Sequence, residues 1–151
     1  MPASSVPAVT LVSATEADFE ELVALRIDAM RESLERVGRF DPARARERFR
    51  AGFSAEYTRH VMVNQQRAGF VAVKPGADQL LLDHLYIRPG HQGQGIGAAV
   101  LAKIFEEADA RAMPLRVGAL RDSDSNRFYQ RNGFQFLSEE EWDIYYIRQP
   151  L

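Results

Sequence analysis

Residues 80–97 read LLLDHLYIRPGHQGQGIG, and this stretch decides the fold. Its first part is apolar and predicts a strand over 79–87. A glycine-rich loop follows at 89–97, and apolar residues then recur at helical spacing over 96–108. Glycines let backbone N–H groups come close to an anion, and the start of a helix adds partial positive charge. The stretch therefore predicts a strand, a loop that binds a phosphate or pyrophosphate, and a helix.

Two common phosphate-binding motifs do not fit this loop. A P-loop needs a lysine and a hydroxyl residue after its second glycine, whereas Gly95 is followed here by Ile96 and Gly97. A dinucleotide-binding fingerprint that starts at Gly95 needs glycine or alanine at position 100, where this chain has Val100. Residues 116–120 offer no acidic side chain for a ribose. The sequence therefore disfavours both nucleotide-binding interpretations.

The segments before the loop alternate between helical and strand periodicity. In chain order we expect a strand at 9–12, helices at 15–38 and 41–53, and strands at 57–64, 67–74 and 79–87. Thr15 is the expected cap of the first helix and Gly38 its stop, while Asp41 and Pro42 begin the second helix. A turn at Gln65-Gln66 joins the first two strands of the group. The short turns predict an antiparallel meander.

The segments after the loop complete a mixed α/β order. We expect a strand at 115–120, a short helix at 122–132 and a hairpin of strands at 134–137 and 142–147. The strand at 115–120 should run parallel to the strand at 79–87, because a helix connects them. Asn132 and Gly133 provide the left-handed end of the short helix.

The composition limits the chemistry that this chain can perform. It has 151 residues, which favours a single domain over 1–151, and it has no cysteine. The lack of cysteine excludes disulfides, thiolate metal sites, iron–sulfur clusters and a cysteine nucleophile. There are three histidines, His60, His84 and His91, and His60 lies well away from the others in sequence. We therefore expect no metal site.

Charge and hydrophobicity indicate which partners to expect. The formal net charge is −2, whereas domains that bind nucleic acid usually have a pI above about 9, so we expect no nucleic-acid partner. No apolar run reaches the roughly 18 residues of a membrane helix. Residues 1–5 lack the basic and apolar segments of a secretory signal. We expect a cytoplasmic protein with no membrane partner.

Two blocks of the sequence carry a family resemblance. Gln92-x-x-Gly95-x-Gly97, after a strand and a proline, resembles the pyrophosphate-binding motif of the GNAT superfamily of N-acetyltransferases. Residues 126–134, NRFYQRNGF, look like the next block of that family. The resemblance covers 9–147 and is weakest over 32–53. It implies an α/β fold with a central, twisted, mostly antiparallel sheet, helices on both faces and splayed strands at the acetyl-CoA site.

The resemblance also implies acetyl-CoA as cosubstrate and assigns residues to its binding. The backbone of Leu85 and Ile87 matches the positions that hold the pantetheine arm, and Asn126 matches the position that hydrogen-bonds the same arm. The amides expected to bind the pyrophosphate are those of Gln92, Gly93, Gln94, Gly95, Ile96 and Gly97.

Three residues are the catalytic candidates. Tyr129 matches the usual general acid of the family, which protonates the departing thiolate. Asp83 and His84 are the candidates for the base that deprotonates the amine, and strand alternation points their side chains to opposite faces. Asp83 matches a position where some members of the family carry a base, whereas a neutral histidine needs no raised pKa to act as one. The choice between them, or a water relay, stays open.

These residues predict an N-acetyltransferase that works by direct attack of an amine on acetyl-CoA in a ternary complex. An acetyl-cysteine intermediate is excluded, because the chain has no cysteine. The acceptor is a small-molecule amine or an amine of a peptide or protein, and a homodimer is left open. The alternative is a non-catalytic acyl-CoA sensor or interaction module on the same fold, because a fold does not fix a function.

Overall fold

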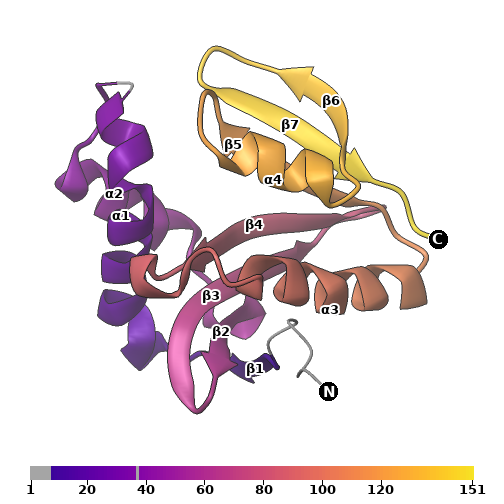
Figure 1. Ribbon diagram of the computed structural model, residues 1–151, viewed down its shortest axis with the longest axis horizontal. Helices are drawn as coiled ribbons and strands as arrows, with labels where there is room; N and C mark the ends of the chain where they lie inside the picture. The colour runs from indigo at the N-terminus through magenta and orange to yellow at the C-terminus, as the bar shows by residue number, and fades with distance from the viewer. Residues whose placement is uncertain (1–7, 37) are drawn as a thin grey trace. The chain divides into compact units, whose positions relative to one another are not determined.

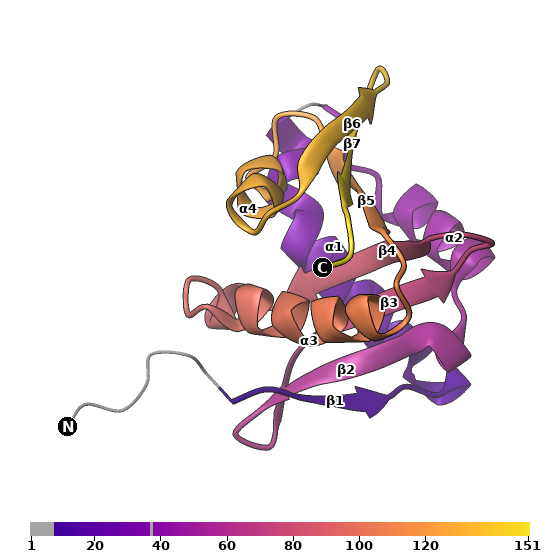
Figure 2. The ribbon, with the colours of Figure 1, turned by 90° about the vertical axis from the view of Figure 1, so that its right-hand side faces the viewer.

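The computed structural model describes residues 8–36 and 38–151 (Figures 1 and 2). The prediction that the start of the chain is no secretory signal concerns residues 1–5, which lie outside the described part. The strands are β1 (Thr10–Ser13), β2 (Thr58–Val63), β3 (Gln66–Pro75), β4 (Leu80–Ile87), β5 (Leu115–Leu120), β6 (Gln135–Glu139) and β7 (Asp143–Arg148). The α-helices are α1 (Phe19–Arg36), α2 (Pro42–Gly52), α3 (Ile96–Ala110) and α4 (Ser125–Arg131). Three 3-10 turns accompany them, η1 (Glu16–Asp18), η2 (Ala55–Tyr57) and η3 (Pro89–His91).

The strands form one seven-stranded sheet in the order β1-β2-β3-β4-β5-β7-β6. The pairs β1–β2, β2–β3, β5–β7 and β6–β7 are antiparallel. β4 and β5 are parallel, with Leu80, Leu81 and Leu82 opposite Leu115, Arg116 and Val117, as the connecting helix predicts. The expected mixed α/β class with a mostly antiparallel sheet is thereby confirmed. Both β4 and β5 continue past this ladder, and their separation at a cofactor site stays a prediction.

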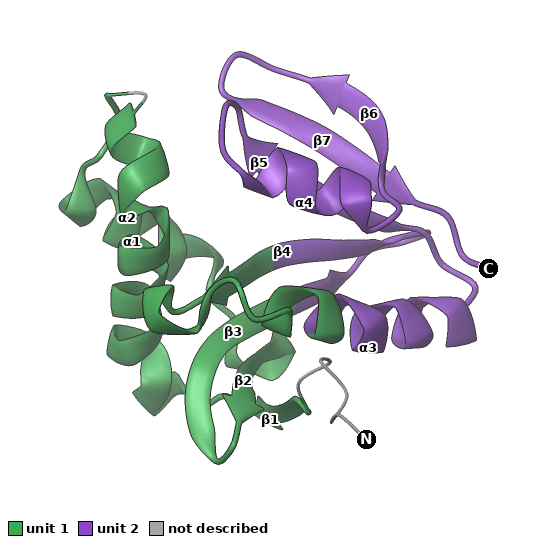
Figure 3. Ribbon diagram, in the orientation of Figure 1, with its two compact units in different colours: residues 1–72, 84–99 green, residues 73–83, 100–151 purple. Residues whose placement is uncertain are grey.

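The chain divides into two compact units (Figure 3). Unit 1 comprises residues 1–72 and 84–99, and unit 2 comprises 73–83 and 100–151. The divisions fall inside β3, β4 and α3, so the chain passes between the units within regular elements. The expectation of a single domain over 1–151 stays a prediction.

Unit 1 has an aromatic core between its first two helices and the sheet. Phe19 on α1 stacks on Phe49 of α2 with ring centroids 5.6 Å apart, and Phe49 meets Phe70 of β3 edge-on at 5.7 Å. All three rings are almost fully buried. The side chain of Asp41 accepts a hydrogen bond from the Arg44 amide over 3.1 Å, which confirms it as the cap of α2.

Unit 2 contains most of α3 together with β5, α4, β6 and β7. The fully buried Val100, Leu101 and Ile104 give α3 an apolar face. Phe134, which follows α4, contacts the rings of Phe105 at 5.7 Å and Tyr129 at 5.3 Å. The Phe134 amide also donates to the Tyr129 carbonyl over 3.0 Å, beyond the left-handed Gly133. The predicted end of α4 is confirmed.

Among the boundaries that differ from the sequence-based expectation, two have a clear conformational reason. The turn between β2 and β3 is made by Asn64 and Gln65, both with positive φ, and not by Gln65 and Gln66. Two consecutive residues with positive φ form a tight hairpin turn whose twist matches the twist of the two strands that it connects. The turn therefore ends at Gln65, and Gln66 is the first residue of β3. The short helix starts at Ser125 and not at residue 122, because Asp122 has a φ of +68° that a right-handed helix does not accept.

Candidate functional site

The two candidate bases on β4 have different neighbours. His84 lies with its ring centroid 5.1 Å from Phe49 and 5.6 Å from Tyr86, so its side chain faces the aromatic core of unit 1. Asp83, which belongs to unit 2, pairs through Oδ2 with the Lys74 ammonium over 3.0 Å. The alternation expected for a strand thus gives one candidate an aromatic environment and the other a cationic neighbour.

The backbone of β4 at its second half is closely approached by β3. A Cβ added at Gly69 would overlap the carbonyl oxygen of Tyr86, so glycine is required there. The Arg88 amide donates to the Ala68 carbonyl over 2.7 Å just beyond the strand. The half-buried Leu85 and Ile87, predicted to hold the pantetheine arm, therefore lie on a strand whose backbone position is fixed by its neighbour.

The glycine-rich loop is exposed from Gln92 to Gly95 and runs directly into α3 at Ile96. Gly93 and Gly95 have φ values of +77° and +79°, which favour glycine. The first helical bond of α3 runs from the Ala99 amide to the Gly95 carbonyl over 3.1 Å, and the amides before it belong to the unpaired first turn of a helix. This geometry suits an anion at the start of α3.

The side chain of Gln92 connects the glycine-rich loop to the strand before it. Its side-chain Nε2 donates to the Ile87 carbonyl over 3.0 Å, and its amide makes a longer bond of 3.3 Å to the Pro89 carbonyl. The side chain therefore ties the loop to the end of β4. The contacts of Gln92 to Gly97 with a pyrophosphate stay a prediction.

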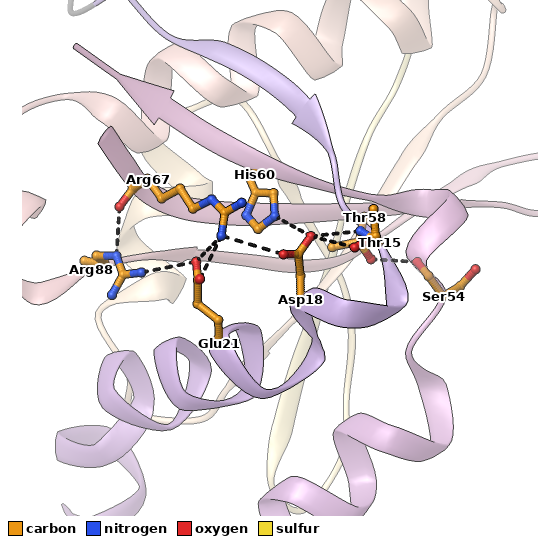
Figure 4. A network of polar contacts seen from close by, with 8 residues as sticks. All are labelled: Thr15, Asp18, Glu21, Ser54, Thr58, His60, Arg67 and Arg88. Atoms are coloured by element: carbon orange, nitrogen blue, oxygen red, sulfur yellow. Dashed lines mark hydrogen bonds and ion pairs between the residues drawn. The ribbon is translucent and has the colours of Figure 1, made fainter. Parts of the chain in front are cut away.

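A polar network holds the residue that precedes the loop (Figure 4). Arg88 donates through Nε to the Arg67 carbonyl over 2.8 Å, and its guanidinium lies 3.7 Å from Glu21 on α1. Arg67 pairs with the same carboxylate at 2.7 Å and with Asp18 at 3.7 Å. Asp18 in turn meets Nε2 of the buried His60 at 3.0 Å. The network joins the start of α1 to β2, β3 and the residue that precedes the loop.

His60 also sets the charge state of Asp18. Its hydrogen bond to Asp18, together with the Thr15 amide, lowers the pKa of that carboxyl from 3.8 to about 2. Sequence reasoning missed this network, because its members are spread over residues 15 to 88. A histidine within the strand at 58–63 was one available signal.

Two further candidate residues of unit 2, Asn126 and Tyr129, lie on α4. Nδ2 of Asn126 donates to the carbonyls of Leu120 and Ser123, both over 2.9 Å, and its Oδ1 accepts from the Tyr146 hydroxyl over 2.8 Å. Burial raises the pKa of Tyr146. Asn126 thus has its amide group fixed by the protein and keeps one lone pair on Oδ1 for a further donor.

Tyr129 is buried, with 5% of its surface exposed. Its ring lies between Phe134 at 5.3 Å and Tyr146 at 6.4 Å. The structure brings Tyr129 and Asn126 together on one short helix, whereas His84 and the glycine-rich loop both belong to unit 1. Their predicted roles in catalysis and cofactor binding are not tested by these contacts and stay predictions.

Metal-ligating clusters and membrane-spanning helices are both missing from the described residues. Within residues 8–36 and 38–151, no group of three or more histidine and acidic side chains is arranged to hold a metal ion. Among the helices of that same part of the chain, none combines the length and the apolar character needed to span a bilayer.

Comparison with known proteins identifies related domains. The family model described as acetyltransferase (GNAT) domain matches residues 55–136. No curated protein matches the chain. The solved structure of PaiA N-acetyltransferase from Thermoplasma acidophilum, in complex with coenzyme A, is 16% identical, with 94% of this chain and 99% of that chain covered and a TM-score of 0.77.

Two further solved structures have the same fold. An acetyltransferase from Thermus thermophilus is 19% identical over 95% of this chain and 98% of that chain, with a TM-score of 0.72. N-acetylglutamate synthase from Neisseria gonorrhoeae, complexed with coenzyme A and N-acetyl-glutamate, is 20% identical over 95% of this chain and 35% of that chain, with a TM-score of 0.68. Together with the family match, they confirm the resemblance found in the two sequence blocks.

Proposed function

The chain belongs to the GNAT acetyltransferase family, and on that premise we propose that it transfers the acetyl group of acetyl-CoA to an amine within a ternary complex. The observation that carries the proposal is the exposed loop of Gln92 to Gly95, with two left-handed glycines at the start of α3. A loop of this geometry offers backbone amides and a helix N-terminus to a pyrophosphate. The lack of cysteine supports direct attack over an acetyl-enzyme on sulfur.

We assign acetyl-CoA binding to three groups of residues. The amides of Gln92, Gly93, Gln94, Gly95, Ile96 and Gly97 bind the pyrophosphate. The backbone of Leu85 and Ile87 holds the pantetheine arm. Oδ1 of Asn126 accepts a hydrogen bond from an amide of that arm, because its Nδ2 is already donating to two carbonyls.

His84 is the base in this proposal. An amine is mostly protonated at neutral pH and attacks only after it loses a proton, which neutral imidazole accepts. If Asp83 took up this proton, it would lose its ion pair with the Lys74 ammonium. The position of His84 among the rings of Phe49 and Tyr86 places its imidazole on the face of β4 that is turned towards α2.

Tyr129 is the proposed general acid. As the C–N bond forms and the C–S bond breaks, the leaving thiolate takes the phenolic proton. A thiol has a pKa near 8.5 and a phenol near 10, so full transfer is uphill by about 2 kcal/mol. Before it gives up this proton, Tyr129 therefore also stabilises the developing thiolate by donating a hydrogen bond during C–S cleavage.

Ligand-dependent melting tests the cofactor, with acetyl-CoA, CoA, ATP and NAD in parallel. A ligand at 100 times its Kd adds about 2.7 kcal/mol, which raises the Tm of a domain of this size by several degrees. We expect a shift with acetyl-CoA and CoA alone. A shift with ATP or NAD and none with CoA would contradict the proposal.

Turnover is then measured with a panel of amines by following released CoA with a thiol reagent. The protein contributes no background, because it has no cysteine. Release that depends on an amine supports the transferase. CoA binding without turnover of any amine would favour the alternative, a non-catalytic acyl-CoA sensor.

A further inference from the structure

Arg26 on α1 is a half-buried cation without a carboxylate partner among the described residues. Its Nη1 is 3.5 Å from the Ala45 carbonyl of α2, the outer limit of a hydrogen bond. Its Cζ lies 5.9 Å from the centroid of the Tyr86 ring. Its Nε is buried and has no hydrogen-bond partner in the described part of the chain.

Other arginines of the protein reach acidic side chains. Arg46 pairs with Glu20, Arg67 with Glu21, and Arg148 with Asp109. A charge that is partly withdrawn from water is normally paired, because desolvation without compensation is costly. A guanidinium has five donors, of which the contacts of Arg26 use one weakly. Arg26 therefore has capacity for an anion from outside the chain.

The chemistry of a guanidinium selects the anion. Its planar fork matches the two oxygens of a carboxylate, and it tolerates an aromatic neighbour better than an ammonium does. The ring of Tyr86 supplies such a neighbour and also positions the guanidinium through a cation–π contact.

Arg26 and the proposed base His84 share a neighbour in unit 1, the ring of Tyr86. The Tyr86 ring, which contacts the guanidinium, lies 5.6 Å from the imidazole of His84. His84 is the base proposed for the acceptor amine. One aromatic side chain therefore contacts both the residue that would bind an anion and the residue that would accept the proton of the amine.

We propose that Arg26 binds the carboxylate of the acceptor, and that the acceptor is a small amine that carries a carboxylate group. This inference rests on the proposed acetyl transfer and deepens it by naming the substrate class. Arg26 selects the acceptor, while His84 acts on its amine.

The test compares amino acids with their carboxamides as acceptors. The two members of each pair differ in the negative charge that Arg26 would bind. We expect wild-type kcat/KM for the acids to exceed that for the amides at least tenfold. In Arg26→Gln this ratio falls towards one, mainly because KM for the acids rises. Arg26→Lys, which keeps the charge and loses the planar fork, gives an intermediate ratio.

Arg31→Gln is the matched control. Arg31 is on the same helix and also lies over an aromatic ring, with its Cζ 4.4 Å from the centroid of Phe40, but it is exposed. We expect this variant to keep the wild-type ratio. An equal loss for acids and amides in Arg26→Gln, or a wild type that does not prefer acids, would overturn the inference.

A binding experiment separates this inference from the proposed function. The same acids and amides are titrated calorimetrically into CoA-saturated wild type and Arg26→Gln. Turnover of amides without any preference for acids would keep the transferase and overturn the role of Arg26. Binding of acids that Arg26→Gln abolishes, without turnover of any amine, would support the anion site and contradict acetyl transfer. No binding and no turnover of any acid would overturn the inference.

Discussion

The hydroxyl of Tyr146 donates a hydrogen bond to Oδ1 of Asn126 over 2.8 Å and so joins β7 to α4. Asn126 completes this arrangement by donating to the carbonyls of Leu120 and Ser123. The side chain proposed to bind the cofactor arm is thus oriented by a buried tyrosine twenty residues further along the chain. Its orientation depends on the packing of unit 2 as a whole.

Tyr146→Phe removes this hydrogen bond and leaves the ring in place. We expect a loss of about 1 kcal/mol in the free energy of unfolding, because a buried acceptor loses its donor. The KM for acetyl-CoA should rise, because Asn126 is held less firmly. Urea denaturation and steady-state kinetics measure the two effects. Tyr145→Phe is the control, since the Tyr145 hydroxyl makes only a 3.5 Å contact to the exposed Glu140, and its stability should stay within about 0.5 kcal/mol of wild type.

Tyr129→Phe tests the general acid. We expect kcat to fall by about 10²-fold, the lower end of what a proton donor contributes, because the departing thiolate loses its donor. The KM for acetyl-CoA should change less than kcat. A melting curve close to wild type shows that the ring still fills its place beside Phe134. An unchanged kcat would assign the proton to water or to another residue.

His84→Gln and Asp83→Asn decide between the two bases. We expect His84→Gln to lower kcat/KM by about 10²-fold and Asp83→Asn to lower it by less than about tenfold. Wild-type activity should fall as the pH drops through the range in which an imidazole takes up a proton, near 6.5 in model peptides. That dependence should be absent in His84→Gln. The reverse order of the two variants would identify Asp83 as the base.

Asp18→Asn tests the network beside the loop. The folded state lowers the pKa of this carboxyl from 3.8 to about 2, so the folded state favours the ionised form. This stabilisation, about 2 kcal/mol, is fully present above the unfolded pKa and is lost as the pH falls from about 4 to about 2. We expect the variant to be less stable by about this amount at pH 7, with the difference shrinking over that window.

Asp124→Asn is the control for this experiment. Asp124 also contacts an arginine, Arg127 at 3.0 Å, but both side chains are largely exposed. Exposed pairs contribute little to stability, so we expect a change within about 0.5 kcal/mol at every pH. If both variants lost the same stability, the interaction of Asp18 with His60 would not be the cause of the effect.

Gly93→Ala tests the conformation of the loop. Gly93 has a φ of +77°, and an L-residue in that region costs roughly 1–2 kcal/mol. The amides beside it should shift, and the Kd for CoA should rise by about tenfold, equivalent to 1.4 kcal/mol. Gly90→Ala is the control, because Gly90 has no left-handed φ and space for a Cβ. Equal CoA affinity in both variants would contradict the assignment of the pyrophosphate to Gln92–Gly97.

The sequence alone determined the elements and the loop, because the signals for these features are local. Period-two and helical spacing predicted β5 at its observed bounds and most of α2 and β4. Glycines placed the loop before α3 and the end of α4 at Gly133. The errors occurred where conformation is not encoded by residue type, as at Asp122, whose positive φ delays α4.

Only the tertiary structure decided which side chains meet. His84 and Asp83 are adjacent in sequence, yet one lies against Phe49 and the other pairs with Lys74. Asp18 and His60, and Asn126 and Tyr146, come from separate elements, and so do Arg26 and Tyr86. Such contacts depend on strand register and on the packing of helices against the sheet, and neither is set by residues close in the chain.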